Sequence, residues 1–256
     1  MVTYLLKKSY QRKDLKEVKF NDLWDGYGIF TTMWIFGKPA KILFFKNHIK
    51  NLIKSLKVYK LNQNNLEKKI LNLLKKNINK NKKYNHLLRV AVNNKIISIS
   101  LRKRFKPKLT FNLKLINHKR YNPEFKNLKY KVILKNLSKM NTSKSDIGLC
   151  NNKIIFESGT SNILFIKKNY IFSPIDKIYK GVTFKFFKNK MNKFIMKNIS
   201  IKSLYEFDEI ILIGTGKGVT SVKTINDIKW KRKNLKFYNI LSKLYKTEIS
   251  KCSIYK

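Results

Sequence analysis

Two glycine-containing elements in the second half of the chain have the composition of anion-binding sites. The first is Gly181-Val182-Thr183, where an amphipathic helix is predicted to begin. The second is Gly214-Thr215-Gly216-Lys217-Gly218, which follows an apolar strand. Backbone N–H groups at a helix N-terminus or in a tight glycine turn can hold an anion. The two elements could therefore bind one phosphate group between them.

A polar run, Glu157-Ser158-Gly159-Thr160-Ser161-Asn162, interrupts two apolar strands in a chain with only 14 acidic residues. A carboxylate buried between such strands needs a cationic partner, because an isolated charge is costly to remove from water. The run therefore predicts a polar site at Glu157 rather than a simple turn.

These motifs, with others in the same order along the chain, resemble the pyridoxal-phosphate enzymes of fold type IV, the class-IV aminotransferase superfamily. Its members include branched-chain and D-amino-acid aminotransferases and 4-amino-4-deoxychorismate lyase. The resemblance is carried in sequence order by Gly26 to Thr32, His48 to Leu52, Leu88-Arg89-Val90, Asn122-Pro123 followed by Leu128-Lys129, Glu157 to Asn162, Gly181 to Thr183 and Gly214 to Thr220.

The resemblance implies a role for each matching residue, and it implies no metal. Lys129 is the lysine that forms the Schiff base with pyridoxal 5′-phosphate and then acts as general acid and base. Glu157 keeps the pyridine nitrogen protonated. Arg89 and Thr31 are the candidate substrate contacts. The remaining cofactor contacts are Asn162, Gly181, Val182, Thr183, Thr215 and Gly216.

The implied activity is that of 4-amino-4-deoxychorismate lyase, which forms 4-aminobenzoate and pyruvate for folate synthesis. Phe30-Thr31-Thr32 and the spacing of Asn122-Pro123 from Lys129 favour the lyase branch. A branched-chain or D-amino-acid aminotransferase stays open, because both reactions use the same lysine and glutamate. A third alternative is a basic RNA-associated protein or a family member that has lost catalysis.

Two departures from the family pattern leave details open. Asn51 stands where the family has a phosphate-binding arginine, so Lys50 or Lys54 would have to replace its charge. Three further lysines lie near Lys129 and could take its role if the register differs: Lys126, Lys131 and Lys135.

Hydrophobic periodicity predicts the elements that must position these residues. Helices are expected at 48–59, 63–78 and 129–140, and another from Gly181 to about Met196. Hairpins are expected around Asn93-Asn94 and Asn151-Asn152, and between 162–167 and 170–173. Further strands are expected at 2–5, 17–19, 28–36, 110–116 and 209–213.

The resemblance implies an α+β, two-lobe fold: a small N-terminal α/β lobe at 1–112 and a larger, β-rich C-terminal lobe at 113–256 that binds the cofactor. It also implies a homodimer acting on a small amino or keto acid.

The composition is strongly basic, with 58 Lys and Arg against 14 acidic residues and a net charge of +44. Lysine supplies nearly all of it and is spread along the whole chain with Asn, Ile, Phe and Tyr. This pattern indicates biased codon usage, so no specific nucleic acid is expected as a partner. Two distant cysteines support neither a disulfide framework nor a zinc site. Lysines interrupt every apolar stretch, so no membrane segment is expected, and a cytoplasmic location is predicted.

Overall fold

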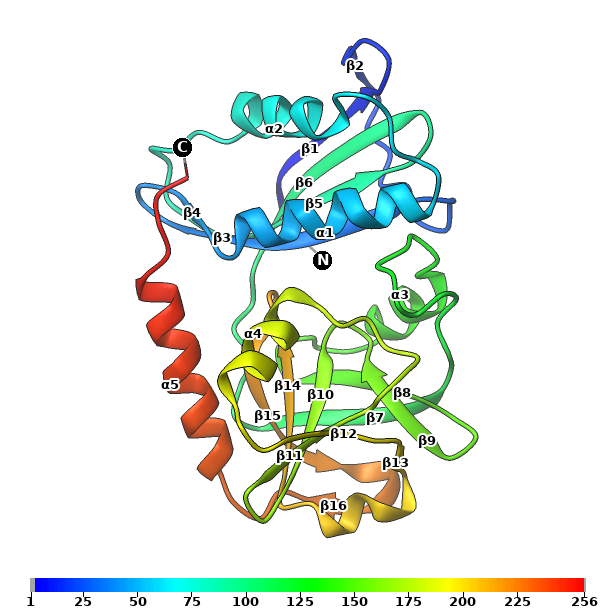
Figure 1. Cartoon of the computed structure of the whole chain (residues 1–256), viewed down its shortest axis with the longest axis vertical. Coiled ribbons are helices and arrows are strands. Elements are labelled where there is room, and N and C mark those ends of the chain that lie inside the picture. Colours follow the sequence, from blue (N-terminus) through cyan, green and yellow to red (C-terminus); the bar gives the residue numbers. More distant parts are fainter. Residues whose placement is uncertain (1–2, 256) are drawn as a thin grey trace. The chain divides into compact units, whose positions relative to one another are not determined.

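The computed structural model describes residues 3–255, which divide into two compact units (Figure 1). The first unit extends to Arg104 and also contains Phe125–Tyr130 and the segment from Lys251 onward. The second unit comprises Phe105–Glu124 and Lys131–Ser250. The predicted division had a single crossing after residue 112. The chain instead crosses after Arg104 and returns twice to the first unit.

Backbone hydrogen bonds attach Phe125–Tyr130 to the first unit, and the local sequence pattern does not predict them. Phe30 N–H donates to Lys126 O (2.8 Å), Leu128 N–H donates to Gly28 O (3.0 Å), and Asp25 N–H donates to Leu128 O (2.9 Å). A Cβ atom on Gly28 would lie 2.6 Å from Leu128 Cδ1 and 2.5 Å from Val92 O, so only glycine allows this close approach. The segment that carries Lys129 is thereby fixed to the strand that carries Thr31.

The first unit is an antiparallel sheet of six strands in the order β2-β1-β6-β5-β3-β4, with two helices. Its elements are β1 (Tyr4–Gln11), β2 (Glu17–Val18), β3 (Ile29–Gly37), β4 (Lys41–Ile42), α1 (Phe45–Val58), α2 (Leu66–Asn77), β5 (Tyr84–Val92) and β6 (Ile96–Lys103).

Alternation along the strands gives this sheet one helix-facing side and one opposite side. Met33, Ile35, Leu88, Val90, Ile97 and Ile99 share one apolar core with the buried stripes of α1 and α2. Figure 1 shows both helices lying along the strands of this sheet. Residues one position away, such as Thr32 and Arg89, therefore face the other side.

The second unit is a mixed sheet of ten strands, with the main order β12-β11-β10-β14-β15-β7-β8-β9-β13 and β16 paired to β15. Its elements are β7 (Phe111–Asn117), α3 (Lys131–Leu137), β8 (Ser145–Asn151), β9 (Ile154–Ser158), β10 (Asn162–Lys167), β11 (Tyr170–Ser173), α4 (Val182–Lys190), β12 (Phe194–Met196), β13 (Ile199–Ser200), η1 (Lys202–Glu206), β14 (Glu209–Gly214), β15 (Gly218–Ile225), η2 (Asn226–Ile228), β16 (Trp230–Lys231) and α5 (Lys236–Ser250).

The core of the second unit is rich in large side chains, with Phe111, Phe165, Phe207 and Trp230 buried in one cluster. Helix α5 lies beside β14 and β15 and buries Phe237, Leu241 and Tyr245, which recur every fourth residue (Figure 1). Among residues 3–255, strands of this sheet pair in parallel where β7 joins β8 and β15 and where β11 joins β12, and the other pairings are antiparallel.

Most predicted elements are confirmed. The helix predicted at 129–140 is shorter, because α3 spans only Lys131–Leu137, and two further elements also differ in length. The predicted strand at 2–5 continues to Gln11, because β1 pairs with β6 along its length. The predicted helix from Gly181 to about Met196 ends at Lys190, and Phe194–Met196 forms β12 beside β11. In both cases pairing with a distant strand overrides local spacing. No helix within residues 3–255 is long and apolar enough to cross a membrane.

Candidate active site

Glu157, near the end of β9, is buried and ion-paired. Its Oε1 lies 2.5 Å from Arg120 Nε, and the two side chains are 7% and 2% exposed. Its Oε2 accepts a hydrogen bond from the backbone N–H of Tyr179 at 3.3 Å. The predicted need for a cationic partner at Glu157 is confirmed, although the sequence alone did not identify that partner. The available signal was that Arg120 is one of only six arginines and lies next to Asn122-Pro123.

Asn162, the first residue of β10, joins the same site from the other end of the polar run. Its Nδ2 donates to Tyr179 O at 2.7 Å, so the backbone of Tyr179 bonds both Glu157 and Asn162. A Cβ atom on Gly181 would lie 3.5 Å from Asn162 Oδ1 and 3.3 Å from the Tyr179 ring. The residues before α4 are therefore held closely against the Glu157–Asn162 run.

Helix α4 begins directly after Gly181 and has no acidic residue in its first turn. The first N–H groups of a helix have no acceptor within it, and together with the helix dipole they favour an anion. Val182 and Thr183 occupy this turn and are 7% and 2% exposed.

The two glycine-containing segments, 181–183 and 214–218, are in contact. Thr183 Oγ1 lies 3.3 Å from Thr215 Oγ1, and both residues are buried. Thr215 and Gly216 lie in the turn between β14 and β15, which Gly218 closes at φ +71°. Beside this turn, Ser161 Oγ is buried without a hydrogen-bond partner among the described residues, and a Cβ on Gly214 would lie 3.0 Å from it.

This donor set fits the cofactor that the resemblance implies. Helix N–H groups, two threonine hydroxyls and an orphaned serine hydroxyl suit a phosphate. A buried carboxylate with its own cationic partner suits a protonated ring nitrogen. Glu157, Asn162, Gly181, Thr183 and Thr215 are thus joined within the second unit.

The predicted residues Lys129, Arg89 and Thr31 belong to the first unit. Lys129 is exposed, and its Nζ donates to Asp25 O at 2.6 Å. The alternative Lys126 lies in the same segment, with its Nζ 5.0 Å from the centre of the Phe30 ring. Lys131 and Lys135 are exposed on α3 in the second unit, and Lys50 and Lys54 are exposed on α1 beside the half-buried Asn51.

Arg89 lies on β5 in an aromatic environment. Its guanidinium carbon is 3.6 Å from the Trp24 ring centre and 5.2 Å from that of Phe30. Nε and Nη2 have no hydrogen-bond partner among residues 3–255, and burial lowers the pKa of Arg89 to about 9. Buried donors of this kind are ready to receive an anion.

Thr31 and Arg89 face opposite sides of their sheet. Thr31 pairs with Val90 and points toward α1, where its Oγ1 lies 2.9 Å from His48 Nδ1. Thr32 pairs with Arg89 and shares its side. Thr32 is therefore the threonine of this strand that accompanies Arg89.

Comparison with known proteins defines the class. A family model for class IV amino-transferases matches residues 28–225, which is most of the chain. The chain therefore belongs to this family, whose enzymes use pyridoxal 5′-phosphate. A comparison with curated protein sequences gives no significant match.

Solved structures of this family share the fold at low sequence identity. The branched-chain aminotransferase of Thermoproteus uzoniensis with norvaline has a TM-score of 0.75 at 16% identity, covering 97% of this chain and 99% of that one. The PLP-bound form of a hypothetical aminotransferase from Mycobacterium tuberculosis has a TM-score of 0.70 at 11% identity, with 95% and 99% covered. A candidate 4-amino-4-deoxychorismate lyase from Legionella pneumophila has a TM-score of 0.68 at 18% identity, with 86% and 91% covered. The predicted α+β fold, enzyme class and cofactor are confirmed.

Proposed function

We propose that the chain is a 4-amino-4-deoxychorismate lyase that releases 4-aminobenzoate and pyruvate. The observation that carries this proposal is Arg89, a buried guanidinium with two unpartnered nitrogens stacked on Trp24. The proposed substrate is a six-membered ring that bears carboxylates. A cation that can pair with a carboxylate, surrounded by aromatic faces that can contact a ring, matches both parts of it.

The surroundings of Arg89 within the first unit support the same substrate. Trp24 lies 4.9 Å from Phe30 and 5.7 Å from Tyr130, measured between ring centres. Thr32, paired with Arg89 across β3 and β5, adds a hydroxyl on the same side. A Phe-Thr-Thr strand of this kind is the form that favours the lyase branch.

Different residues of the chain would contact different parts of the cofactor. When bound, pyridoxal 5′-phosphate supplies an electron sink for the bonds at the substrate's amino-bearing carbon. Glu157, ion-paired with Arg120, would hold a proton at the ring nitrogen. Val182, Thr183, Thr215 and Gly216 would orient the phosphate. Lys129 Nζ would attach the cofactor and afterwards move the proton.

An aminotransferase for branched-chain or D-amino acids is the second candidate, because the same lysine and glutamate serve both reactions. The apolar faces of Trp24, Phe30 and Tyr130 would also suit an apolar side chain. For either activity we propose a cytoplasmic homodimer. Light scattering on the purified protein tests the oligomeric state.

One assay separates the two activities. The purified protein is supplied with pyridoxal 5′-phosphate and 4-amino-4-deoxychorismate, and 4-aminobenzoate and pyruvate are quantified. A parallel reaction contains branched-chain or D-amino acids with 2-oxoglutarate, and glutamate is quantified. We expect 4-aminobenzoate and pyruvate in equal amounts, with loss of turnover in Arg89→Met. Glutamate formation without 4-aminobenzoate would overturn the lyase assignment in favour of the aminotransferase.

A further inference from the structure

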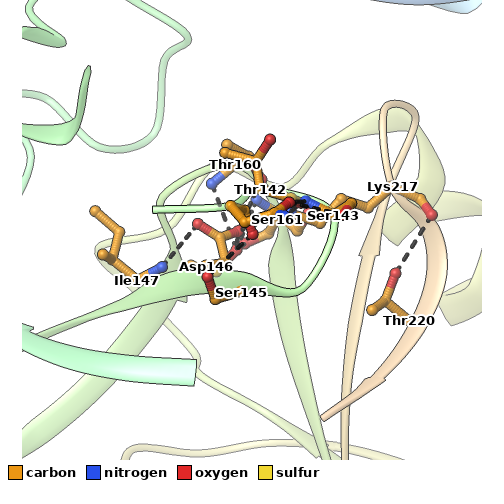
Figure 2. A network of polar contacts seen from close by, with 11 residues as sticks. Thr142, Ser143, Ser145, Asp146, Ile147, Thr160, Ser161, Lys217 and Thr220 are labelled. Atoms are coloured by element: carbon orange, nitrogen blue, oxygen red, sulfur yellow. Dashed lines mark hydrogen bonds and ion pairs between the residues drawn. The ribbon is translucent and has the colours of Figure 1, made fainter. Parts of the chain in front are cut away.

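Asp146, on β8, has no exposed surface and connects three parts of the second unit (Figure 2). Its Oδ2 accepts hydrogen bonds from Ser158 Oγ at 3.0 Å and Thr160 Oγ1 at 2.8 Å. Its Oδ1 accepts from the backbone N–H of Ile147 at 2.8 Å. The carboxylate thereby holds the polar run between Glu157 and Asn162.

Lys217, in the turn between β14 and β15, forms an ion pair with the same carboxylate. Its Nζ lies 3.6 Å from Asp146 Oδ2, and its side chain is only 10% exposed. The ammonium also lies 3.4 Å from Thr142 O and 4.6 Å from the centre of the Phe111 ring. Each of these neighbours stabilises a cation that is largely withdrawn from water.

We propose that Asp146 and Lys217 form a positioning pair for the cofactor site, an inference that rests on the pyridoxal-phosphate function proposed above. Through Ser158 and Thr160, Asp146 fixes the run that begins at Glu157. Through Lys217 it fixes the turn that contains Thr215 and Gly216. The contacts for the two ends of the cofactor, the ring nitrogen and the phosphate, are thereby kept at a fixed separation.

The contacts distinguish this role from a purely structural one. Removing one partner of a buried ion pair costs stability because the other charge is left uncompensated. Hydrogen bonds to the remaining carboxylate reduce that cost, and Asp146 accepts three of them. In Lys217→Met the new side chain can still lie against Phe111, and Asp146 keeps its bonds from Ile147, Ser158 and Thr160. The turn loses its attachment to Asp146, so the affected quantity is the placement of the phosphate contacts.

Cofactor affinity of the apoprotein is the measurement that tests the pair. The wild type, Lys217→Met, Lys217→Arg and the control Lys223→Met are titrated with pyridoxal 5′-phosphate and, separately, with pyridoxal, which lacks the phosphate. Lys223 is an exposed lysine on β15, the strand that follows the turn of Lys217. We expect Lys217→Met to weaken binding of the phosphorylated form by about tenfold and binding of pyridoxal by less than about threefold. Lys217→Arg should recover most of the affinity, and Lys223→Met should match the wild type.

A double variant tests whether the two residues act together. If they do, Asp146→Asn combined with Lys217→Met binds no more weakly than Asp146→Asn alone. Equal affinity of wild type and Lys217→Met for the phosphorylated cofactor would overturn the positioning role while leaving the cofactor class intact. Equal weakening toward both ligands, with a matching fall in the apoprotein's melting temperature, would also overturn it. A wild type that binds neither ligand would reject the proposed function, and the pair's role with it.

Discussion

Arg120 and Glu157 form an ion pair that is almost completely withdrawn from water. Removing the cation leaves a buried, uncompensated carboxylate, so Arg120→Met should lower the free energy of unfolding by about 3–5 kcal/mol. Urea denaturation of the apoprotein measures this change. Adding Glu157→Gln to Arg120→Met should restore more than half of the loss, because no charge then remains. If the double variant is no more stable than Arg120→Met, the loss comes from packing instead.

His48 gives the fold a specific sensitivity to acid. The residue is buried on α1, and burial, followed by the positive charge of Lys126, lowers the pKa of His48 to about 3. The unfolded chain takes up this proton near its ordinary pKa of about 6.5, so the unfolded state binds more protons and stability falls as the pH drops below that value. Between about pH 6.5 and about pH 5 the loss is about 2 kcal/mol.

Denaturation of the wild type and of His48→Gln across this pH range isolates that contribution, since the two other histidines are present in both proteins. We expect the wild type to lose stability more steeply than His48→Gln on acidification. Parallel curves would show that folding does not lower the pKa of His48.

For single residues, the sequence predicted which chemical groups are needed better than it predicted where they lie. Glu157 was expected to need a cation because carboxylates are rare in the chain and this one lies between apolar strands. That the cation is Arg120 depends on a contact across 37 residues, which spacing does not reveal. Likewise, Thr31 and Thr32 are equivalent by type, and only the pairing of β3 with β5 decides which of them shares a side with Arg89.

Helix α5 begins at a buried carboxylate supplied by another element. Glu209, on β14, accepts hydrogen bonds from Phe237 N–H at 2.6 Å and Tyr238 N–H at 2.9 Å. Glu209→Ala leaves these groups without their acceptor and should cost about 1–3 kcal/mol, whereas Glu209→Gln retains an acceptor oxygen and should cost less. Urea denaturation followed by circular dichroism measures both. Equal losses for the two variants would contradict a hydrogen-bonding role.

Elements formed from neighbouring residues could be predicted, whereas those formed by distant pairing could not. The hairpin around Asn93-Asn94 is confirmed because Asn93 Oδ1 accepts bonds from the N–H groups of Lys95 and Ile96, a turn that the sequence itself specifies. The parallel pairing of β7 with β15 joins residues about a hundred positions apart, and no turn signal marks it. The separation of the motif residues between two units follows from the same long-range pairing.

The whole molecule carries a net charge of +44. Its like-charged lysines and arginines repel one another, and this repulsion destabilises the folded state. Raising NaCl from about 0.05 to about 0.5 M shortens the screening length and should raise the melting temperature. Polyanions such as RNA should bind without sequence preference and dissociate over the same range. Calorimetry and a binding titration with unrelated RNA sequences test these expectations. A preference for one RNA that persists at physiological salt would contradict the interpretation of the charge as codon bias.

We propose that this class IV enzyme attaches its cofactor through Lys129. The direct test is the absorbance spectrum of the purified protein with pyridoxal 5′-phosphate, compared with Lys129→Ala and with Lys131→Ala as the matched control. We predict a visible band of lysine-bound cofactor in the wild type and in Lys131→Ala, and its absence in Lys129→Ala. A band that survives in Lys129→Ala would contradict the assignment of Lys129. The absence of a band from the wild type would contradict cofactor attachment in this chain altogether.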